Sequence, residues 1–201
     1  MSRFPGAEAY ASQAAKLIER YESVAAEEVH EEILHLLPAH PCRALDIGAG
    51  SGRDASWLAD LGHAVTAVEP TAEMRAAGMR LHPHPRIEWI DDGLPELAAL
   101  RARQPFDLVM ATAVWMHLDA EERSRAMTRL AELARPGAVM AMLLRHGPVP
   151  EGRRMFAVGA EETAALAEAA GFELLVNRPR RTLREDAPAG VSWTALAFGR
   201  A

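Results

Sequence analysis

The apolar residues follow two alternating patterns from about residue 40 onward. Short, nearly continuous apolar runs are typical of strands buried inside a parallel sheet. They occur at residues 44–47, 63–68, 86–90, 108–111 and 139–144. Apolar residues at helical spacing lie between them, most clearly over 54–61 and 120–134. This alternation of strand and helix predicts an α/β fold with a mostly parallel sheet.

The end of the chain departs from this alternation. A helix is predicted over residues 161–170, with Gly171 as its C-terminal cap, followed by a strand over 173–176. The last apolar run, residues 191–198, follows that strand with no helix between them. It therefore pairs most easily in the antiparallel direction.

The first forty residues carry a helical pattern. Apolar residues over 8–37 recur at mixed three- and four-residue spacings, which predicts one long or broken helical segment that ends at Pro38 and Pro41. We therefore expect a helical extension or lid over residues 1–40 and an α/β domain over residues 41–201. Tyr21 either covers a bound ligand from this extension or packs at the edge of the core.

A glycine-rich turn links the first predicted strand to the helix after it. Glycines at positions 48, 50 and 52 allow positive φ angles and a close approach of a ligand to the backbone. A dinucleotide-binding turn would place its third glycine at position 53, where Arg53 stands. Asp46, two residues before the first glycine, would repel a pyrophosphate but suits a ligand with a positive charge.

This D-x-G-x-G-x-G turn resembles the first motif of the class I S-adenosylmethionine (SAM) dependent methyltransferases. The resemblance implies a Rossmann-like, doubly wound sheet in three α/β/α layers, with a C-terminal antiparallel strand. It implies SAM as the cofactor and S-adenosylhomocysteine (SAH) as the product. It also implies that Asp46 holds the amino end of the cofactor and that the loop backbone passes beside it at Gly48, Ala49, Gly50 and Gly52.

An acidic residue follows the second predicted strand. Glu69, with Pro70 after it, stands about twenty residues beyond the glycine turn, where nucleotide-binding α/β units place a carboxylate for the ribose hydroxyls. The alternative is a charge at the N-terminus of the helix that begins near Thr71. The ribose role is favoured because turn, helix, strand and acid occur in the order that one binding site requires.

The third predicted strand is followed by Asp91, Asp92 and Gly93. Ligands of open α/β sheets bind at the carboxyl ends of the strands, so an aspartate here is expected to reach the adenine amine. The resemblance favours Asp92 over Asp91. Either residue is alternatively an ordinary turn residue.

Residues 112–118, after the fourth predicted strand, are similar to the methyltransferase stretch that lies beside the methionine end of the cofactor and faces the substrate. The resemblance implies cofactor contacts from the backbone of Thr112 and Ala113. His117 positions the substrate or takes a proton, or it is a structural histidine at the start of the next helix. Trp115 lines the substrate pocket, stacks on adenine, or packs in the core.

A basic loop punctuated by glycine and proline, residues 145–156, follows the fifth predicted strand. By the strand-end rule it lies on the ligand side of the sheet and is expected to select the substrate. Arg145 and His146 are candidates for binding a carboxylate or phosphate, and His146 is a second candidate for catalysis. Arg153 and Arg154 are interpreted as surface arginines beside a turn.

Composition narrows the choice of partner and compartment. The 201 residues carry a net charge of −6, which argues against nucleic acid as a partner. Cys42 is the single cysteine, which excludes an internal disulfide, and no metal site is expected. Neither a signal peptide nor a long apolar span is evident. We expect a soluble cytoplasmic protein, monomeric or homodimeric, that does not bind membranes.

The resemblance implies methyl transfer by direct displacement, in which a substrate nucleophile attacks the methyl carbon in line with the departing sulfur. The chain lacks the Asn/Asp-Pro-Pro-Tyr/Phe pattern of methyltransferases that act on amino groups of bases or glutamine. We therefore expect a small-molecule acceptor with an oxygen or nitrogen nucleophile. The alternatives are a SAM-binding module without methyl transfer and a nicotinamide-dependent oxidoreductase.

Overall fold

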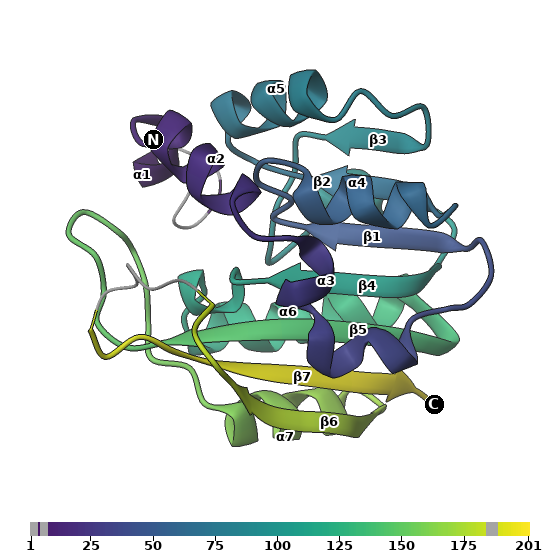
Figure 1. Cartoon of the computed structure of the whole chain (residues 1–201). Coiled ribbons are helices and arrows are strands. Elements are labelled where there is room, and N and C mark those ends of the chain that lie inside the picture. The colour runs from purple at the N-terminus through teal and green to yellow at the C-terminus, as the bar shows by residue number, and fades with distance from the viewer. Residues whose placement is uncertain (1–3, 5–7, 184–188) are drawn as a thin grey trace.

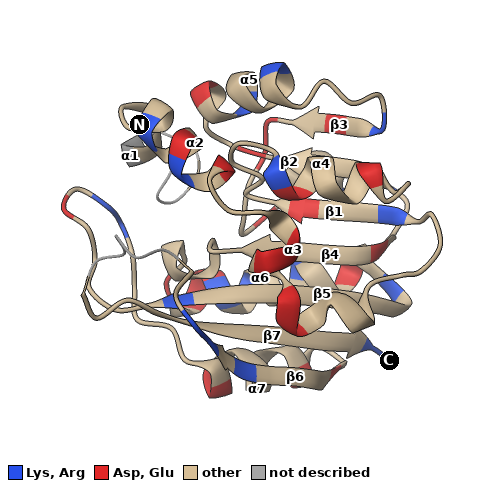
Figure 2. Cartoon of the chain, in the orientation of Figure 1, with Lys and Arg blue, Asp and Glu red and all other residues tan. Residues whose placement is uncertain are grey.

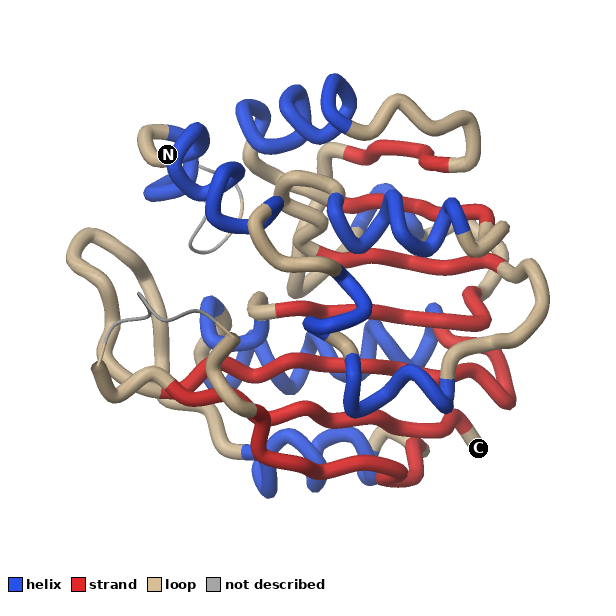
Figure 3. The backbone as a smooth tube through the Cα atoms, viewed as in Figure 1, coloured by secondary structure: helices blue, strands red, loops and turns tan. Residues whose placement is uncertain are grey.

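The computed structural model of the chain describes residue 4 and residues 8–183 and 189–201. Within these residues, seven strands form one sheet in the order β3-β2-β1-β4-β5-β7-β6 (Figures 1 and 3). The strands are β1 (Arg43–Ile47), β2 (Ala64–Val68), β3 (Ile87–Ile90), β4 (Phe106–Thr112), β5 (Ala134–His146), β6 (Phe172–Arg180) and β7 (Ser192–Arg200). The first five are mutually parallel, and β7 runs antiparallel between β5 and β6. The predicted fold class is confirmed.

The strand register brings the ends of the central strands together. Ile47, the last residue of β1, pairs with Val68 at the end of β2 and with Ala111 near the end of β4. The turns that follow these strands therefore leave the sheet side by side. This carboxyl edge is where open α/β sheets bind their ligands.

Helices cover both faces of the sheet (Figure 1). The longer ones after β1 are α4 (Arg53–Asp60), α5 (Ala72–Leu81), α6 (Ala120–Leu133) and α7 (Ala160–Ala169), and two short 3₁₀ helices are η2 (Ala98–Leu100) and η3 (Trp115–His117). Helix α6 begins with a capping box at Asp119. The Asp119 side chain accepts from the Glu122 N–H, and the Glu122 carboxylate accepts from the Asp119 N–H. Gly171, at a φ of 86°, follows the end of α7 as its C-terminal cap residue.

Alternate residues of each central strand belong to two separate cores. Leu45 and Ile47 of β1 pack with α6 residues such as Leu130 in one core. Ala44, from the same strand, packs with Leu58 of α4 in the other. A strand buried on both faces needs apolar residues at successive positions, which explains the continuous apolar runs of the sequence.

The N-terminal segment is a series of short helices, which settles the choice between a long and a broken helix. They are α1 (Glu8–Ala11), α2 (Ala14–Glu22), α3 (Ala26–Val29) and the 3₁₀ helix η1 (Glu31–Leu36). Helices α1 and α2 lie at the carboxyl edge of the sheet near α5, and η1 packs on β6 and β7 (Figure 1).

Two strands extend beyond their predicted ends. The apolar run predicted a strand over residues 139–144, but β5 begins at Ala134, directly after α6, and pairs there with Phe106. Gly137, at a φ of 82°, lets the strand continue through this irregular stretch. Strand β6 runs on to Arg180 because all of its length pairs with β7. Among the residues described, no helix is long and apolar enough to cross a membrane.

Candidate active site

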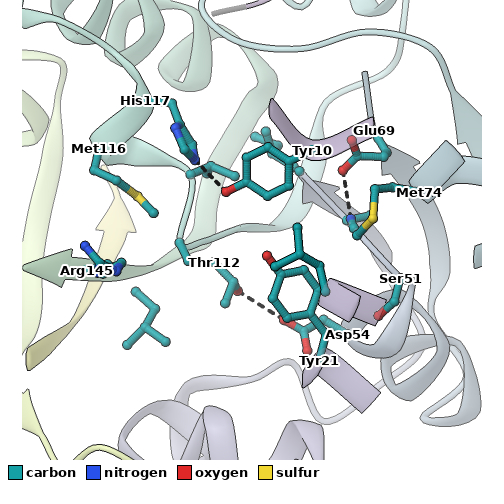
Figure 4. Close-up of a pocket in the computed structure, with 18 of the residues that line it drawn as sticks. Tyr10, Tyr21, Ser51, Asp54, Glu69, Met74, Thr112, Met116, His117 and Arg145 are labelled. Atoms are coloured by element: carbon teal, nitrogen blue, oxygen red, sulfur yellow. Dashed lines mark hydrogen bonds between the residues drawn. The ribbon is translucent and has the colours of Figure 1, made fainter. Parts of the chain in front are cut away.

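A cavity of about 450 Å³ opens at the carboxyl edge of the sheet. Its wall combines the turns after β1, β2 and β4 with residues of α1, α2 and the loop after β5 (Figure 4). Of the residues singled out from the sequence, the following line it: Tyr21, Asp46, Gly48, Ala49, Gly50, Glu69, Pro70, Gly93, Thr112, Ala113, His117 and Arg145.

The glycine turn forms one end of the cavity. Gly48, Gly50 and Gly52 have φ angles of 68°, 57° and 89°, a region that favours glycine. The N–H groups of Gly48 and Ala49 both donate to the Val68 carbonyl, at 2.8 and 3.0 Å, so the turn is fixed to the end of β2. A Cβ at position 48 would lie 2.2 Å from Cγ1 of Val114. Glycine is therefore required there by both conformation and space.

Glu69 lies across the turn from these glycines, and its side chain is almost fully buried. Its Oε2 accepts from the Gly50 N–H at 2.9 Å, and its Oε1 accepts from the Thr71 N–H at 2.8 Å (Figure 4). Burial raises the pKa of Glu69, and these two N–H donors oppose the shift. The Glu69 carboxylate thus joins the glycine turn to the start of α5, as the alternative role at a helix N-terminus predicted. It also lines the cavity, so the ribose role stays open.

Asp46 has a buried carboxylate oxygen with no hydrogen-bond partner among the described residues. This oxygen, Oδ2, lies at the end of β1 in the cavity wall. Burial, together with the negative charge of Asp54, raises the pKa of Asp46 well above its usual value. An unpaired buried carboxylate is costly, so this position favours a ligand that brings a positive, hydrogen-bonding group.

A second buried acid, Asp54, is fully paired. Its Oδ2 lies 2.9 Å from Nε2 of His30 and accepts from Thr112 Oγ1 at 3.1 Å, and its Oδ1 accepts from Arg53 Nε at 2.7 Å. Burial raises the pKa of Asp54, but His30 and Arg53 outweigh burial and hold it below its usual range. The cluster ties α3 to the glycine turn and to the end of β4.

His117 is held by both ring nitrogens at the other side of the cavity. Nδ1 lies 2.9 Å from the carbonyl oxygen of Arg154, which only accepts, so Nδ1 carries the hydrogen. Nε2 is then the acceptor for the hydroxyl of Tyr10, at 2.9 Å (Figure 4). Burial, with the nearby positive charge of Arg153, lowers the pKa of His117 despite the carbonyl contact.

Two tyrosines of the N-terminal helices cover the cavity. Tyr10 comes from α1, and Tyr21, from α2, lies over the glycine turn with ring carbons 3.5 Å from where a Cβ of Gly50 would be. Both rings are labelled in Figure 4 between His117 and the turn. Burial raises the pKa of both phenols, so each remains a neutral hydroxyl.

Comparison with known proteins finds similarity to methyltransferases. A family model described as "Methyltransferase domain" matches residues 44–137, the part of the chain that holds β1 to the end of α6. The chain is 29% identical over 121 residues to uncharacterized methyltransferases of Mycobacterium tuberculosis and Mycobacterium bovis. That match covers 56% of this chain and only 44% of each relative.

Solved structures extend the likeness to the whole fold. A TehB-like SAM-dependent methyltransferase of Corynebacterium glutamicum aligns with a TM-score of 0.69 at 17% identity, covering 94% of this chain and 99% of that one. A 1,6-didemethyltoxoflavin-N1-methyltransferase of Burkholderia thailandensis, solved with bound 1,6-didemethyltoxoflavin and SAH, aligns with a TM-score of 0.68 at 18% identity. The alignment covers 100% of this chain and 93% of that one. The fold is therefore that of the class I SAM-dependent methyltransferases, and residues 44–137, just under half of the chain, match a methyltransferase domain.

Trp115 and His146 do not line the cavity, which corrects the expectation that they face a substrate there. Trp115 is fully buried in the core between the sheet and α6, the alternative that the sequence had left open. His146 uses both ring nitrogens inside the fold, with Nδ1 at 3.1 Å from the Val158 carbonyl and Nε2 at 2.9 Å from Thr194 Oγ1. Neither side chain lines the cavity, so neither is placed to act on a substrate there.

The two aspartates that were expected to contact the adenine, Asp91 and Asp92, do not line the cavity. Asp91 is exposed and pairs with Arg75 at 3.3 Å, while Asp92 is buried and accepts from the N–H groups of Gly93 and Ala99 at 2.9 and 2.7 Å. Both aspartates lie outside the cavity wall, where Gly93 and Leu94 stand instead. Gly52 likewise faces away from the cavity, because a Cβ there would meet the Trp89 ring at 2.9 Å.

Several residues of the site were not found from the sequence. Tyr10 and His30 had no recognisable motif, Asp54 was not singled out, and Arg153 was interpreted as a surface residue. Arg153 instead lines the cavity and stacks on Tyr10, with its guanidinium carbon 4.5 Å from the ring centre. Arg154 fits its structural interpretation, because it pairs with Asp119 and Glu122 at the start of α6, at 3.2 and 2.8 Å. The acid pattern around the turn was the available signal for Asp54.

Proposed function

We propose that the chain transfers a methyl group from SAM to a small-molecule acceptor with an oxygen or nitrogen nucleophile, by direct displacement. One observation carries this proposal more than any other. Asp46 holds a buried carboxylate oxygen that has no partner among the described residues, beside a glycine turn that packs closely against Val114. A ligand with an ammonium group satisfies that oxygen, and SAM carries one.

The residues at this end of the cavity fit the cofactor. Asp46 would hold its amino group, the backbone of the turn at Gly48 and Gly50 would lie alongside, and Glu69 has lone pairs left for the ribose hydroxyls. Gly93 and Leu94 are proposed for the adenine, in place of the aspartates, and the backbone at Thr112 and Ala113 for the methionine portion. When bound, SAM supplies an electrophilic methyl group on a sulfonium.

The chain's own contribution to the reaction is alignment, exclusion of water and proton removal. Nε2 of His117 is the one ring nitrogen there with a lone pair, and the lowered pKa keeps it unprotonated at neutral pH. Because this lone pair already accepts the Tyr10 hydroxyl, we propose that an acceptor hydroxyl or ammonium gives its proton to the Tyr10 oxygen while Tyr10 passes its own proton to Nε2. Tyr10 and Tyr21 close the cavity above the turn, which favours a dry, aligned complex.

The size of the cavity supports a small acceptor. About 450 Å³ lies in the usual range of small-molecule sites. The Burkholderia relative acts on 1,6-didemethyltoxoflavin, and a Synechocystis relative is a magnesium protoporphyrin IX methyltransferase. Residues 1–40 are proposed as the lid of a catalytic domain formed by residues 41–201, in a reducing compartment that suits the lone thiol of Cys42.

Calorimetry with SAM, SAH and NAD tests the proposal. We expect SAM and SAH to bind and NAD not to, and Asp46→Ala and Glu69→Ala to weaken SAH binding. Binding of NAD alone would refute the proposal in favour of an oxidoreductase. Unchanged SAH affinity in both variants would refute the site. A screen of methyl acceptors by homocysteine release then tests catalysis, and inactivity across all acceptor classes would favour a SAM-binding module.

A further inference from the structure

We infer that the methyl acceptor is an anion whose carboxylate or phosphate binds Arg145 and Arg153, in the part of the cavity away from the glycine turn. The inference rests on the proposed function and names the class of its substrate. It begins from the way charge is distributed along the cavity wall.

The acids of the described wall all lie at the cofactor end. They are Asp46, Asp54 and Glu69, at the end of β1, the start of α4 and the end of β2. Positive side chains come mostly from other elements, with Lys16 and Arg20 on α2 and with Arg145 and Arg153 at and after the end of β5. Figure 2 shows the basic residues on α2 and on the loop beyond β5. The acids of the wall thus come from the turns around the glycines, whereas its cations come mainly from α2 and from the segment at and after the end of β5.

Two other arginines of the wall, Arg53 and Arg180, are neutralised by carboxylates. Arg53 pairs with Asp54 at 2.7 Å, and Arg180 pairs with Glu32 at 3.2 Å. Arg145 differs, because its guanidinium donates to the Pro148 carbonyl at 3.0 Å. Arg153 donates to the Tyr10 hydroxyl at 3.3 Å and to Gln13 Oε1 at 3.1 Å. Within the described part of the chain, these two cations therefore meet only neutral acceptors.

Arg153 also retains an unused donor. Its Nε is buried and has no hydrogen-bond partner among the described residues. Arg20, Arg145 and Arg153 line the same cavity, and burial together with the charges of Arg153 and Arg20 lowers the pKa of Arg145. An anion placed there would neutralise their repulsion and accept charge-assisted hydrogen bonds.

The rest of this wall is apolar. Leu143 and Trp193, from neighbouring strands, and Met116 and Met155 face the same cavity. Met116 and Arg145 are labelled beside each other in Figure 4. The combination fits an organic acid or a phosphate ester with an apolar body, and it does not favour a cationic amine.

Calorimetry on the SAH-saturated protein tests this with four probes of one shape. They are benzoate, phenyl phosphate, neutral benzamide and cationic benzylamine. We expect benzoate or phenyl phosphate to bind about tenfold or more tightly than benzamide, and benzylamine to bind least. Whichever of the two anions binds more tightly indicates whether the methyl acceptor carries a carboxylate or a phosphate. Arg145→Gln should abolish the preference, whereas Arg101→Gln, an exposed arginine outside the cavity, should leave it intact.

The outcomes separate this inference from the proposed function. SAH binding is measured first in the native protein and in each variant. If the native protein does not bind SAH, the methyltransferase proposal itself is refuted. With SAH bound, equal affinity for benzoate and benzamide, tighter binding of benzylamine, or no binding of either anion would overturn the inference. So would an undiminished preference in Arg145→Gln with normal SAH affinity.

Discussion

The hydroxyl of Tyr10 lies 2.9 Å from Nε2 of His117, although 107 residues separate them in the sequence. The two rings meet edge to face, with centres 5.5 Å apart. Tyr10 belongs to the N-terminal extension and His117 to the turn after β4, so one hydrogen bond joins the proposed lid to the proposed base. Loss of this bond should be seen in the opening of the lid.

Tyr10→Phe removes the hydroxyl and keeps the ring. A net hydrogen bond is worth about 0.5–1.5 kcal/mol, so the N-terminal helices should open about two- to tenfold more often. Lys16 in α2 is the only lysine of the chain, so a lysine-specific protease reports this opening at a single site. We expect proportionally faster cleavage there. Thr128→Ala, which loses a hydroxyl bond on the far helix α6, is the control, and equal cleavage rates in all three proteins would contradict the prediction.

Asp46→Asn should uncouple cofactor binding from proton release. Burial and Asp54 raise the pKa of Asp46, and an ammonium ligand should lower it again, so binding at a pH below the raised pKa should release a proton. SAH affinity should therefore rise as pH rises through that pKa. Calorimetry in buffers of different ionisation enthalpy should detect the released proton in the native protein and not in Asp46→Asn, which should bind about tenfold or more weakly. Asp60→Asn, exposed at the end of α4, should retain the release.

Gly48→Ala should abolish tight SAH binding. The new Cβ lies 2.2 Å from Val114 Cγ1, and its φ of 68° is unfavourable for alanine. Gly137→Ala is the matched control, because it has a φ of 82° with nothing within 4 Å. It should lose only about 1–2 kcal/mol of stability and leave SAH binding unchanged. Adding Val114→Ala to Gly48→Ala removes the clash and should restore part of the affinity. Native-like binding by Gly48→Ala alone would rule out this account of the turn.

The sequence was sufficient for the fold and for most of the cavity wall around the glycine turn, but not for Gly52, Asp91 and Asp92, nor for the wall formed by α1 and the loop after β5. Strands such as β1 are buried on both faces, and a glycine turn with a preceding acid is local in sequence, so both leave a readable pattern. No such pattern shows that His146, expected in the site, lies inside the fold, or that Arg153, expected at the surface, lines the cavity. His146 faces the fold because β7 pairs beside it and supplies Thr194, while Arg153 is turned inward by Tyr10, 143 residues away.

Asp54 should contribute stability that is lost in acid. Its folded pKa lies below the unfolded value near 4, so its contribution is complete above that value and declines as pH falls from about 4 toward the folded pKa. Asp54→Asn leaves Arg53 and His30 without their carboxylate and should cost about 3 kcal/mol at pH 7. Urea unfolding at pH 7 and near pH 3 should show this difference shrinking in acid. A difference that is constant across this range would exclude the ion-paired state.

The pH dependence of methyl transfer should identify His117 as the proton acceptor. Burial lowers its pKa from the usual 6.5, so the native rate should be level at and above pH 6.5 and fall only in more acidic solution. His117→Gln keeps a side chain of similar reach but loses the basic nitrogen, and it should slow turnover about 100-fold and remove the acidic limb. SAH affinity should not change, which distinguishes loss of a base from collapse of the site. His35→Gln, at an exposed histidine of η1, is the control for altered charge. An acidic limb that persists in His117→Gln would assign the proton transfer to the acceptor or to water.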